Sequence, residues 1–74
     1  SEMCIRDRAN IVANAILSLA PAVPGLMAEG ATFIASGIID SRKDEVIAGL
    51  KKAGLAVAEV KEKRGWECIV CKKA

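Results

Sequence analysis

Histidine is absent from this chain of 74 residues, and its aromatic residues are limited to one Trp and one Phe, with no Tyr. Without an imidazole, these residues cannot supply a histidine base or a histidine metal ligand. Proteins that bind single-stranded nucleic acids stack the bases on aromatic rings, so the scarcity of rings argues against that class of binder. The formal net charge of +2 is too small to indicate a polyanionic partner.

Cysteine is also scarce, and its number is odd: Cys4, Cys68 and Cys71. Small secreted domains usually carry an even set of cysteines that closes a disulfide framework. The composition therefore favours a reducing, cytoplasmic setting. The length allows at most one small domain, and a domain of this size buries only about 60 to 65% of the surface that its unfolded chain exposes.

The first eight residues, SEMCIRDR, are polar and charged, do not begin with Met, and differ in character from the apolar stretch after them. They resemble the peptide obtained when sequencing-adapter bases are translated at the end of an assembled read. We therefore expect residues 1–8 to be a non-native scar outside the fold, and we give Cys4 no role. The alternative is a ragged native strand at the edge of a sheet.

An apolar stretch runs from Ile11 to Met27, and three interpretations compete for it. A transmembrane helix needs about 20 apolar residues, whereas this stretch is shorter and contains an asparagine and two prolines. A signal sequence over residues 6–22 fits the preceding arginines but would place asparagines in its apolar core. The favoured interpretation is a helix from about Ala13, followed by a short turn that begins at Pro21. The residues expected to pack on a sheet are Ile16, Leu17, Leu19 and Ala20.

Between Gly30 and Asp40 the sequence GATFIASGIID predicts a buried strand that leads into a helix. No charged residue occurs from Ala31 to Ile39, which is typical of a parallel strand covered on both faces. Alternation divides the side chains between the faces, with Phe33 and Ala35 on one and Thr32, Ile34 and Ser36 on the other. Gly30 and Gly37 are expected to tolerate positive φ where the strand begins and ends.

Residues Ser41–Ala53, SRKDEVIAGLKKA, give the clearest helical pattern, because apolar residues recur at helical spacing opposite a charged face. The start should be capped by Asp40 or Ser41, with Ser41 and Asp44 approximating a capping box. Asp40 and Asp44 are thus interpreted as cap residues rather than as catalytic acids or bases. Gly54 is expected to follow the last turn as the residue that ends the helix.

Two β-like segments, Leu55–Lys63 and Trp66–Lys72, are joined by Arg64 and Gly65, which predicts an antiparallel hairpin. The more charged first segment should lie at the edge of the sheet and the more apolar second one inside it. We interpret Trp66 as a hydrophobic anchor under the end of the sheet, and the charged run 61–64 as a solvated hairpin tip.

The predicted strand order is therefore the Ala31 strand, the Trp66 strand and the Leu55 strand, with the middle one reversed. The resulting fold class is α/β: a parallel strand, a helix and then an antiparallel hairpin. Rossmann-like methyltransferases close their parallel sheet in this way, with a reversed last strand inserted next to the edge.

Cys68 and Cys71 form a CxxC pair, which suggests a redox or zinc site. Residues three apart on a strand point to opposite faces, however, so the two thiols cannot chelate one ion. A single CxxC without a second pair or a histidine is also only half of a zinc site. We therefore expect packed thiols and no metal ligands.

Several blocks of the sequence resemble the ribosomal protein L-eleven methyltransferase family in order and spacing. The blocks are ANIVA from Ala9, LAPAVPGLMAEGATFIASGIIDSRKDEV, KKAGLAVAEV and RGWECIV. Together they cover residues 9–73, and residues 9–74 would then be the carboxyl-terminal portion of a class I methyltransferase domain. Two features depart from the family: Ala28-Glu29-Gly30 stands where it usually has Lys-Pro-Gly-Gly, and SEMCIRDR replaces the strand that precedes ANI.

This resemblance implies the carboxyl-terminal fragment of an enzyme that transfers methyl groups from S-adenosylmethionine to lysine amino groups of a large-subunit ribosomal protein. It implies no direct nucleic-acid or membrane partner. One cofactor-binding residue follows from it, Asn10, at the carboxyl end of the strand missing upstream. The alternative for Asn10 is a cap of the next helix.

The glycine-rich turn and the acidic residue about 20 positions further on, which such cofactor sites need, do not occur at the required spacing. We therefore expect the fragment by itself to be inactive. The competing interpretation is a non-enzymatic small α/β protein or an exported protein, with residues 6–22 as its signal sequence and the hairpin as a binding surface.

Overall fold

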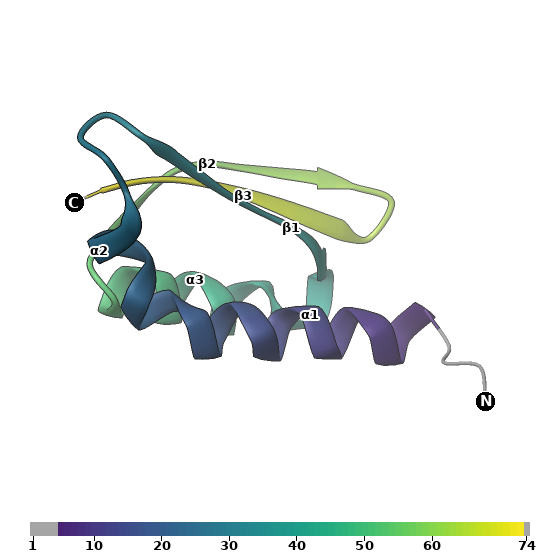
Figure 1. Ribbon diagram of the computed structural model, residues 1–74. Helices are drawn as coiled ribbons and strands as arrows, with labels where there is room; N and C mark the ends of the chain where they lie inside the picture. The colour runs from purple at the N-terminus through teal and green to yellow at the C-terminus, as the bar shows by residue number, and fades with distance from the viewer. Residues whose placement is uncertain (1–4, 74) are drawn as a thin grey trace.

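A computed structural model describes residues 5–73, which form two main helices on one face of a three-stranded sheet (Figure 1). Helix α1 (Ile5–Leu19) leads through the short helices η1 (Ala20–Ala22) and α2 (Val23–Leu26) to strand β1 (Thr32–Ile39). The turn η2 (Asp40–Arg42) and helix α3 (Lys43–Lys52) then lead to the hairpin of β2 (Leu55–Lys63) and β3 (Trp66–Lys73). The core lies between the helices and the sheet. Its buried apolar residues are Ala13, Ala20, Ala35, Ile38, Val46, Leu50, Leu55, Ile69 and Cys71.

The strand order is β1-β3-β2, and β3 pairs antiparallel with both neighbours. The predicted order and the reversed middle strand are thus confirmed. Strands β1 and β2 run in the same direction but do not pair with each other, so all the strand pairs described are antiparallel. The α/β class holds. The parallel, Rossmann-like part of the predicted sheet is not among the described residues.

The prediction that β1 is covered on both faces is wrong for this structure. Phe33 and Ala35 do face the core, but Ile34 on the opposite face is 59% exposed, and Thr32 and Ser36 are exposed beside it. The physical reason is visible in Figure 1, where α1 and α3 lie on the same side of the sheet. An uncharged strand sequence permits cover on a second face, but the chain described here provides none.

A β-bulge interrupts β1 between Ala35 and Ile38, where the pairing register with β3 shifts. Gly37 lies inside this bulge with φ of 76°, so its positive φ is confirmed, although within the strand rather than at its end. The extra residue lets Ala35 and Ile38, three apart in sequence, both face the core, where they are 2% and 0% exposed.

Helix α1 begins at Ile5, well before the predicted start near Ala13. Ile16, Leu17 and Ala20 pack against the core as expected, whereas Leu19 is 62% exposed and its predicted packing is wrong. Pro21 occupies the first turn of η1, as predicted. None of the described helices has the length and apolar character needed to cross a membrane.

The scar predicted for residues 1–8 remains a prediction, because nothing observed bears on its origin. Its alternative, a ragged strand, is wrong for residues 5–8, which are helical. Cys4 lies outside the described residues.

Helix α3 is confirmed in position, with Val46 and Leu50 buried, but its predicted caps are wrong. The chain passes from β1 into the 3-10 turn η2 before α3 starts, and no side chain caps either segment. The backbone N–H of Asp40 instead donates to the carbonyl oxygen of Gly65 at 2.9 Å, so the hairpin turn takes up this donor. At the other end Gly54, with φ of 102°, ends the helix as predicted.

The hairpin turn is also confirmed, since Arg64 and Gly65 both have positive φ, at 53° and 84°. This geometry matches the type I′ turn that suits the twist of a two-residue hairpin. Residues 61–65 are all exposed, as expected of a solvated tip. Trp66 is half-buried, and alternation along β3 places it on the face opposite the buried Glu67, so it does not lie under the sheet within the core.

Replacing the fully buried Leu50 by Ala should lower the free energy of unfolding by about 2 to 5 kcal/mol, because it leaves a cavity between α3 and the sheet. Urea unfolding of the 74-residue chain, followed by circular dichroism, measures the change. Leu26→Ala is the matched control, since Leu26 is 85% exposed and its truncation should change stability by no more than about 0.5 kcal/mol. Equal losses in both variants would contradict the observed core.

Candidate functional site

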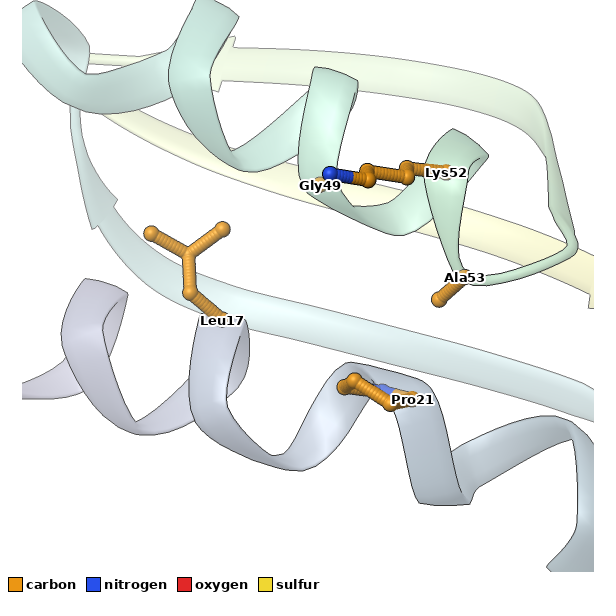
Figure 2. A pocket seen from close by; sticks show the side chains of 5 residues that line it. All are labelled: Leu17, Pro21, Gly49, Lys52 and Ala53. Atoms are coloured by element: carbon orange, nitrogen blue, oxygen red, sulfur yellow. The ribbon is translucent and has the colours of Figure 1, made fainter.

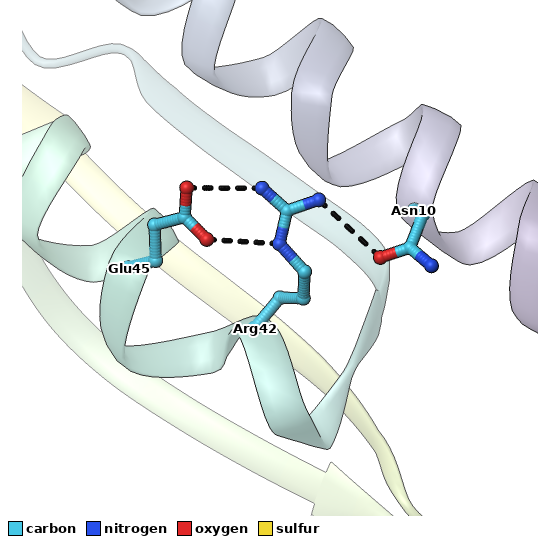
Figure 3. Close-up of polar contacts among 3 residues, drawn as sticks. All are labelled: Asn10, Arg42 and Glu45. Carbon is cyan, nitrogen blue, oxygen red and sulfur yellow. Dashed lines mark hydrogen bonds and ion pairs between the residues drawn. The ribbon is translucent and has the colours of Figure 1, made fainter.

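Asn10, the predicted cofactor residue, contacts a fixed arginine in this structure (Figure 3). The Nη1 of Arg42 donates to the Oδ1 of Asn10 at 3.3 Å, across 32 residues of sequence. Arg42 also holds Glu45 through two bonds, from Nε to Oε1 at 2.9 Å and from Nη2 to Oε2 at 3.0 Å. Asn10 and Arg42 are half-buried, and Glu45 is exposed.

This contact places Asn10 beside the carboxyl end of β1, because Arg42 belongs to the η2 turn that directly follows that strand. In open α/β sheets, ligands bind beyond the carboxyl ends of strands. The alternative that Asn10 caps the next helix is wrong here, since Asn10 lies inside α1. Sequence reasoning did not identify Arg42 or Glu45, and only their spacing of three residues on a helix start could have indicated the pair.

The ion pair shifts the pKa of both partners. The hydrogen bond from Arg42 lowers the pKa of Glu45, and the bond to Glu45 raises the pKa of Arg42. Both groups are therefore charged at neutral pH. The pairing of a planar guanidinium with both carboxylate oxygens fixes the orientation of the arginine side chain.

A second polar cluster lies at the same end of the sheet, where carboxylate oxygens of Asp40, Glu62 and Glu67 come within 4.8 Å of one another. Glu67 is 2% exposed, and neither of its oxygens receives a hydrogen bond from the residues that the structure describes. A proton on Glu67 would allow it to donate to Asp40. That hydrogen bond, followed by removal from water, raises the pKa of Glu67, and the nearby charge of Lys43 opposes the shift.

Three carboxylates at this spacing are a donor set suited to a hard divalent cation, but a shared proton also relieves the repulsion between them. Sequence reasoning missed the cluster because Glu67 stands in an otherwise apolar strand, and Asp40 was interpreted as a helix cap. The alternation of Glu67 with Ile69 and Cys71 on one face of β3 was the available signal.

Cys68 and Cys71 lie on opposite faces of β3, as predicted, with Cys71 fully buried and Cys68 half-buried. Burial raises the pKa of the Cys71 thiol. This thiol is therefore protonated at neutral pH and behaves as a packed apolar group.

A groove lies between α1 and α3, and Figure 2 shows the side chain of Leu17 extending from α1 toward Gly49. Pro21, Ala53 and Lys52 complete its lining. Apart from the amine of Lys52, the side chains that line it are apolar.

The arrangement defines an α/β protein whose polar side chains gather where a strand gives way to a helix, the position of ligand sites in that class. The comparisons with known proteins are more specific. The family model described as ribosomal protein L11 methyltransferase (PrmA) matches residues 8–74, and the chain belongs to that family.

Curated relatives of the same name agree with this assignment. The chain is 42% identical over 65 residues to the ribosomal protein L11 methyltransferase of Agathobacter rectalis, an alignment that covers 88% of this chain and 20% of the relative. It is 50% identical over 58 residues to the ribosomal protein L11 methyltransferase of Desulfitobacterium hafniense, and this alignment covers 78% of the chain and 19% of the relative. The chain thus spans about a fifth of the length of the relatives it matches.

Replacing Glu67 by Gln should raise the free energy of unfolding at neutral pH, because it removes a carboxylate buried without a donor. The pKa of Glu67 is raised in the folded chain, so its unfavourable effect is absent below the ordinary carboxyl pKa and grows as the pH rises toward the folded-state value. The difference in unfolding free energy between the variant and the parent should therefore increase as the pH rises and disappear in acid. Urea unfolding at several pH values measures it.

Glu29→Gln provides the control for this prediction, because Glu29 is an exposed carboxylate in the loop before β1. Its substitution should give no comparable gap. A gap for Glu67→Gln that stays constant from acid to neutral pH would show that titration of Glu67 is not its cause.

Proposed function

We propose that this chain is the carboxyl-terminal part of an enzyme that transfers methyl groups from S-adenosylmethionine to lysine amino groups of ribosomal protein L11. The observation that carries the proposal is the family match over residues 8–74. We further propose that the enzyme acts in the cytoplasm, without a metal ion and without direct contact to nucleic acid. The rival, an exported or non-enzymatic protein, is not favoured, since the family match includes most of residues 6–22.

Within this proposal Asn10 contacts the cofactor. Its position supports the role, because it lies next to the turn after β1, where an open α/β sheet leaves room for a ligand. A carboxamide can both donate and accept hydrogen bonds, so it can hold a polar group of the cofactor. The bond to Arg42 reduces the freedom of the amide before any ligand arrives.

S-adenosylmethionine supplies a methyl group on a sulfonium, which needs little further activation. The task left to the protein is to hold the sulfonium, the methyl group and a neutral amine in line. Asn10 would contribute to that alignment at one rim of the site. With no histidine in the chain, a base for the departing ammonium proton would not be an imidazole of these residues.

The residues present fit only this one rim of a cofactor site. The glycine-rich turn and the distant acidic residue of such a site are not found at the required spacing in the sequence. The greater part of the pocket would therefore come from the four-fifths of the enzyme that the matched relatives possess beyond this segment.

The 74-residue chain alone should show no measurable binding of S-adenosylmethionine in isothermal titration calorimetry, because it contributes a single contact residue. Binding with a micromolar Kd would contradict the proposal that most of the cofactor pocket comes from the part of the enzyme outside this segment. Urea unfolding of the same preparation, showing a cooperative transition, serves as the control that the chain was folded during the titration.

A chimera tests the function itself. Residues 9–74 of this chain replace the matching segment of the Desulfitobacterium hafniense relative, which is 50% identical over 58 residues. The chimera should transfer methyl groups from radiolabelled S-adenosylmethionine to ribosomal protein L11, and Asn10→Ala should lower kcat/KM by about 10- to 100-fold through lost hydrogen bonding and alignment. Asn14→Ala, an exposed asparagine on the same helix, is the matched control.

A folded chimera without activity on ribosomal protein L11 would count against the proposed substrate. An active chimera that is indifferent to Asn10→Ala would count against the cofactor contact alone. The two results therefore separate the function of the enzyme from the role of this residue.

A further inference from the structure

We propose that Arg42 is a positioning residue that fixes the side-chain amide of Asn10, holding its Oδ1 and presenting its Nδ2 as a donor to the ligand. The proposal rests on the function proposed for the enzyme, because it assigns Arg42 a role through Asn10. Nothing in the sequence motifs singled out Arg42, and the inference comes from its contacts.

The chemistry of the guanidinium decides which end of the amide faces it. Arginine has five N–H donors and no acceptor, so the atom of Asn10 beside it must be the carbonyl oxygen. The Nη1 to Oδ1 distance of 3.3 Å fits this assignment. Figure 3 shows the consequence, with the amide nitrogen of Asn10 turned away from Arg42.

Arg42 can hold the amide because it is itself held. Its Nε and Nη2 bind the two oxygens of Glu45, which leaves Nη1 as the nitrogen that reaches Asn10. The side chain of Arg42 is only 20% exposed, whereas that of Glu45 is 56% exposed. The arginine thus lies between an anchoring carboxylate at the start of α3 and the amide on α1.

The amide then has a defined polarity toward a ligand. With Oδ1 facing the cationic guanidinium, the two hydrogens of Nδ2 are the groups most available to a ligand, and they bind acceptors such as a carboxylate or carbonyl oxygen. A ligand amine would have to share Oδ1 with the guanidinium, through the second lone pair of that oxygen. Asn10 should therefore act mainly on binding of the cofactor, whose amino-acid portion carries a carboxylate, and less on the incoming amine.

A double-mutant cycle in the same chimera tests this role. The variants are Asn10→Ala, Arg42→Met and the two combined, and calorimetry measures the Kd for S-adenosylmethionine. We expect Arg42→Met to weaken binding about 3- to 10-fold, the loss of one charge-assisted hydrogen bond. If Arg42 acts through Asn10, the double variant should bind no more weakly than Asn10→Ala alone.

Two further variants keep the test independent of general damage. Arg42→Lys retains a donor but cannot hold both oxygens of Glu45, so it should recover part of the lost affinity. Glu45→Gln leaves Arg42 in place but weakens its anchor, and should shift the Kd in the same direction by a smaller factor. Arg64→Met, at the exposed hairpin tip, is the matched arginine control and should leave the Kd unchanged.

The outcomes distinguish this proposal from the one it rests on. Weak binding by Asn10→Ala together with normal binding by Arg42→Met overturns the positioning role only. The positioning role is also overturned if the fold-change in Kd of the double variant equals the product of the two single fold-changes, because Arg42 would then act independently of Asn10. Normal cofactor binding by Asn10→Ala overturns the proposed cofactor contact, and the role of Arg42 with it.

Discussion

The pairing of β3 with both of its neighbours is the interaction on which the rest of the structure depends. β3 is the last strand in sequence and the middle strand in space, so β1 and β2 belong to one sheet only through it. Its buried face carries Glu67, Ile69 and Cys71 toward the helices. Because its pairs with β1 join residues 27 to 40 positions apart, the sheet forms only when distant parts of residues 32–73 come together, and the cost of loop closure must be offset by burial of the core.

The one-sided helix layer follows from this sheet and produces the candidate site. The crossover from β1 through α3 to β2 returns to the same sheet, so α3 must cover one face, and α1 packs beside it on that face. Their proximity brings Asn10 of α1 to Arg42 at the start of the α3 segment. A polar contact across 32 residues of sequence is thus a result of two helices sharing one layer.

The same end of the sheet holds two kinds of polar environment. Arg42 and Glu45 form an ion pair in which the guanidinium binds both oxygens of the carboxylate, so each charge has a partner of opposite sign. The Glu67 carboxyl group, by contrast, is buried beside Asp40, and the hydrogen bond that it can donate to Asp40, followed by removal from water, raises its pKa. In the fold described here a strand end with a fixed amide and a carboxyl group of altered acidity lies where α/β proteins bind ligands.

The sequence by itself determined the elements with strong local signals: the helix around Val46 and Leu50, the hairpin at Arg64 and Gly65, and the order of the strands. These depend on periodicity, turn chemistry and the contrast between apolar and charged strands, which are readable over a few residues. Family resemblance pointed to Asn10 but not to the side chain that holds it. Only the tertiary structure decided the bulge at Gly37, the open face of β1, the burial of Glu67 and the partner of Asn10. Each of these depends on which distant segment lies alongside, and an isolated stretch of sequence does not specify its neighbours.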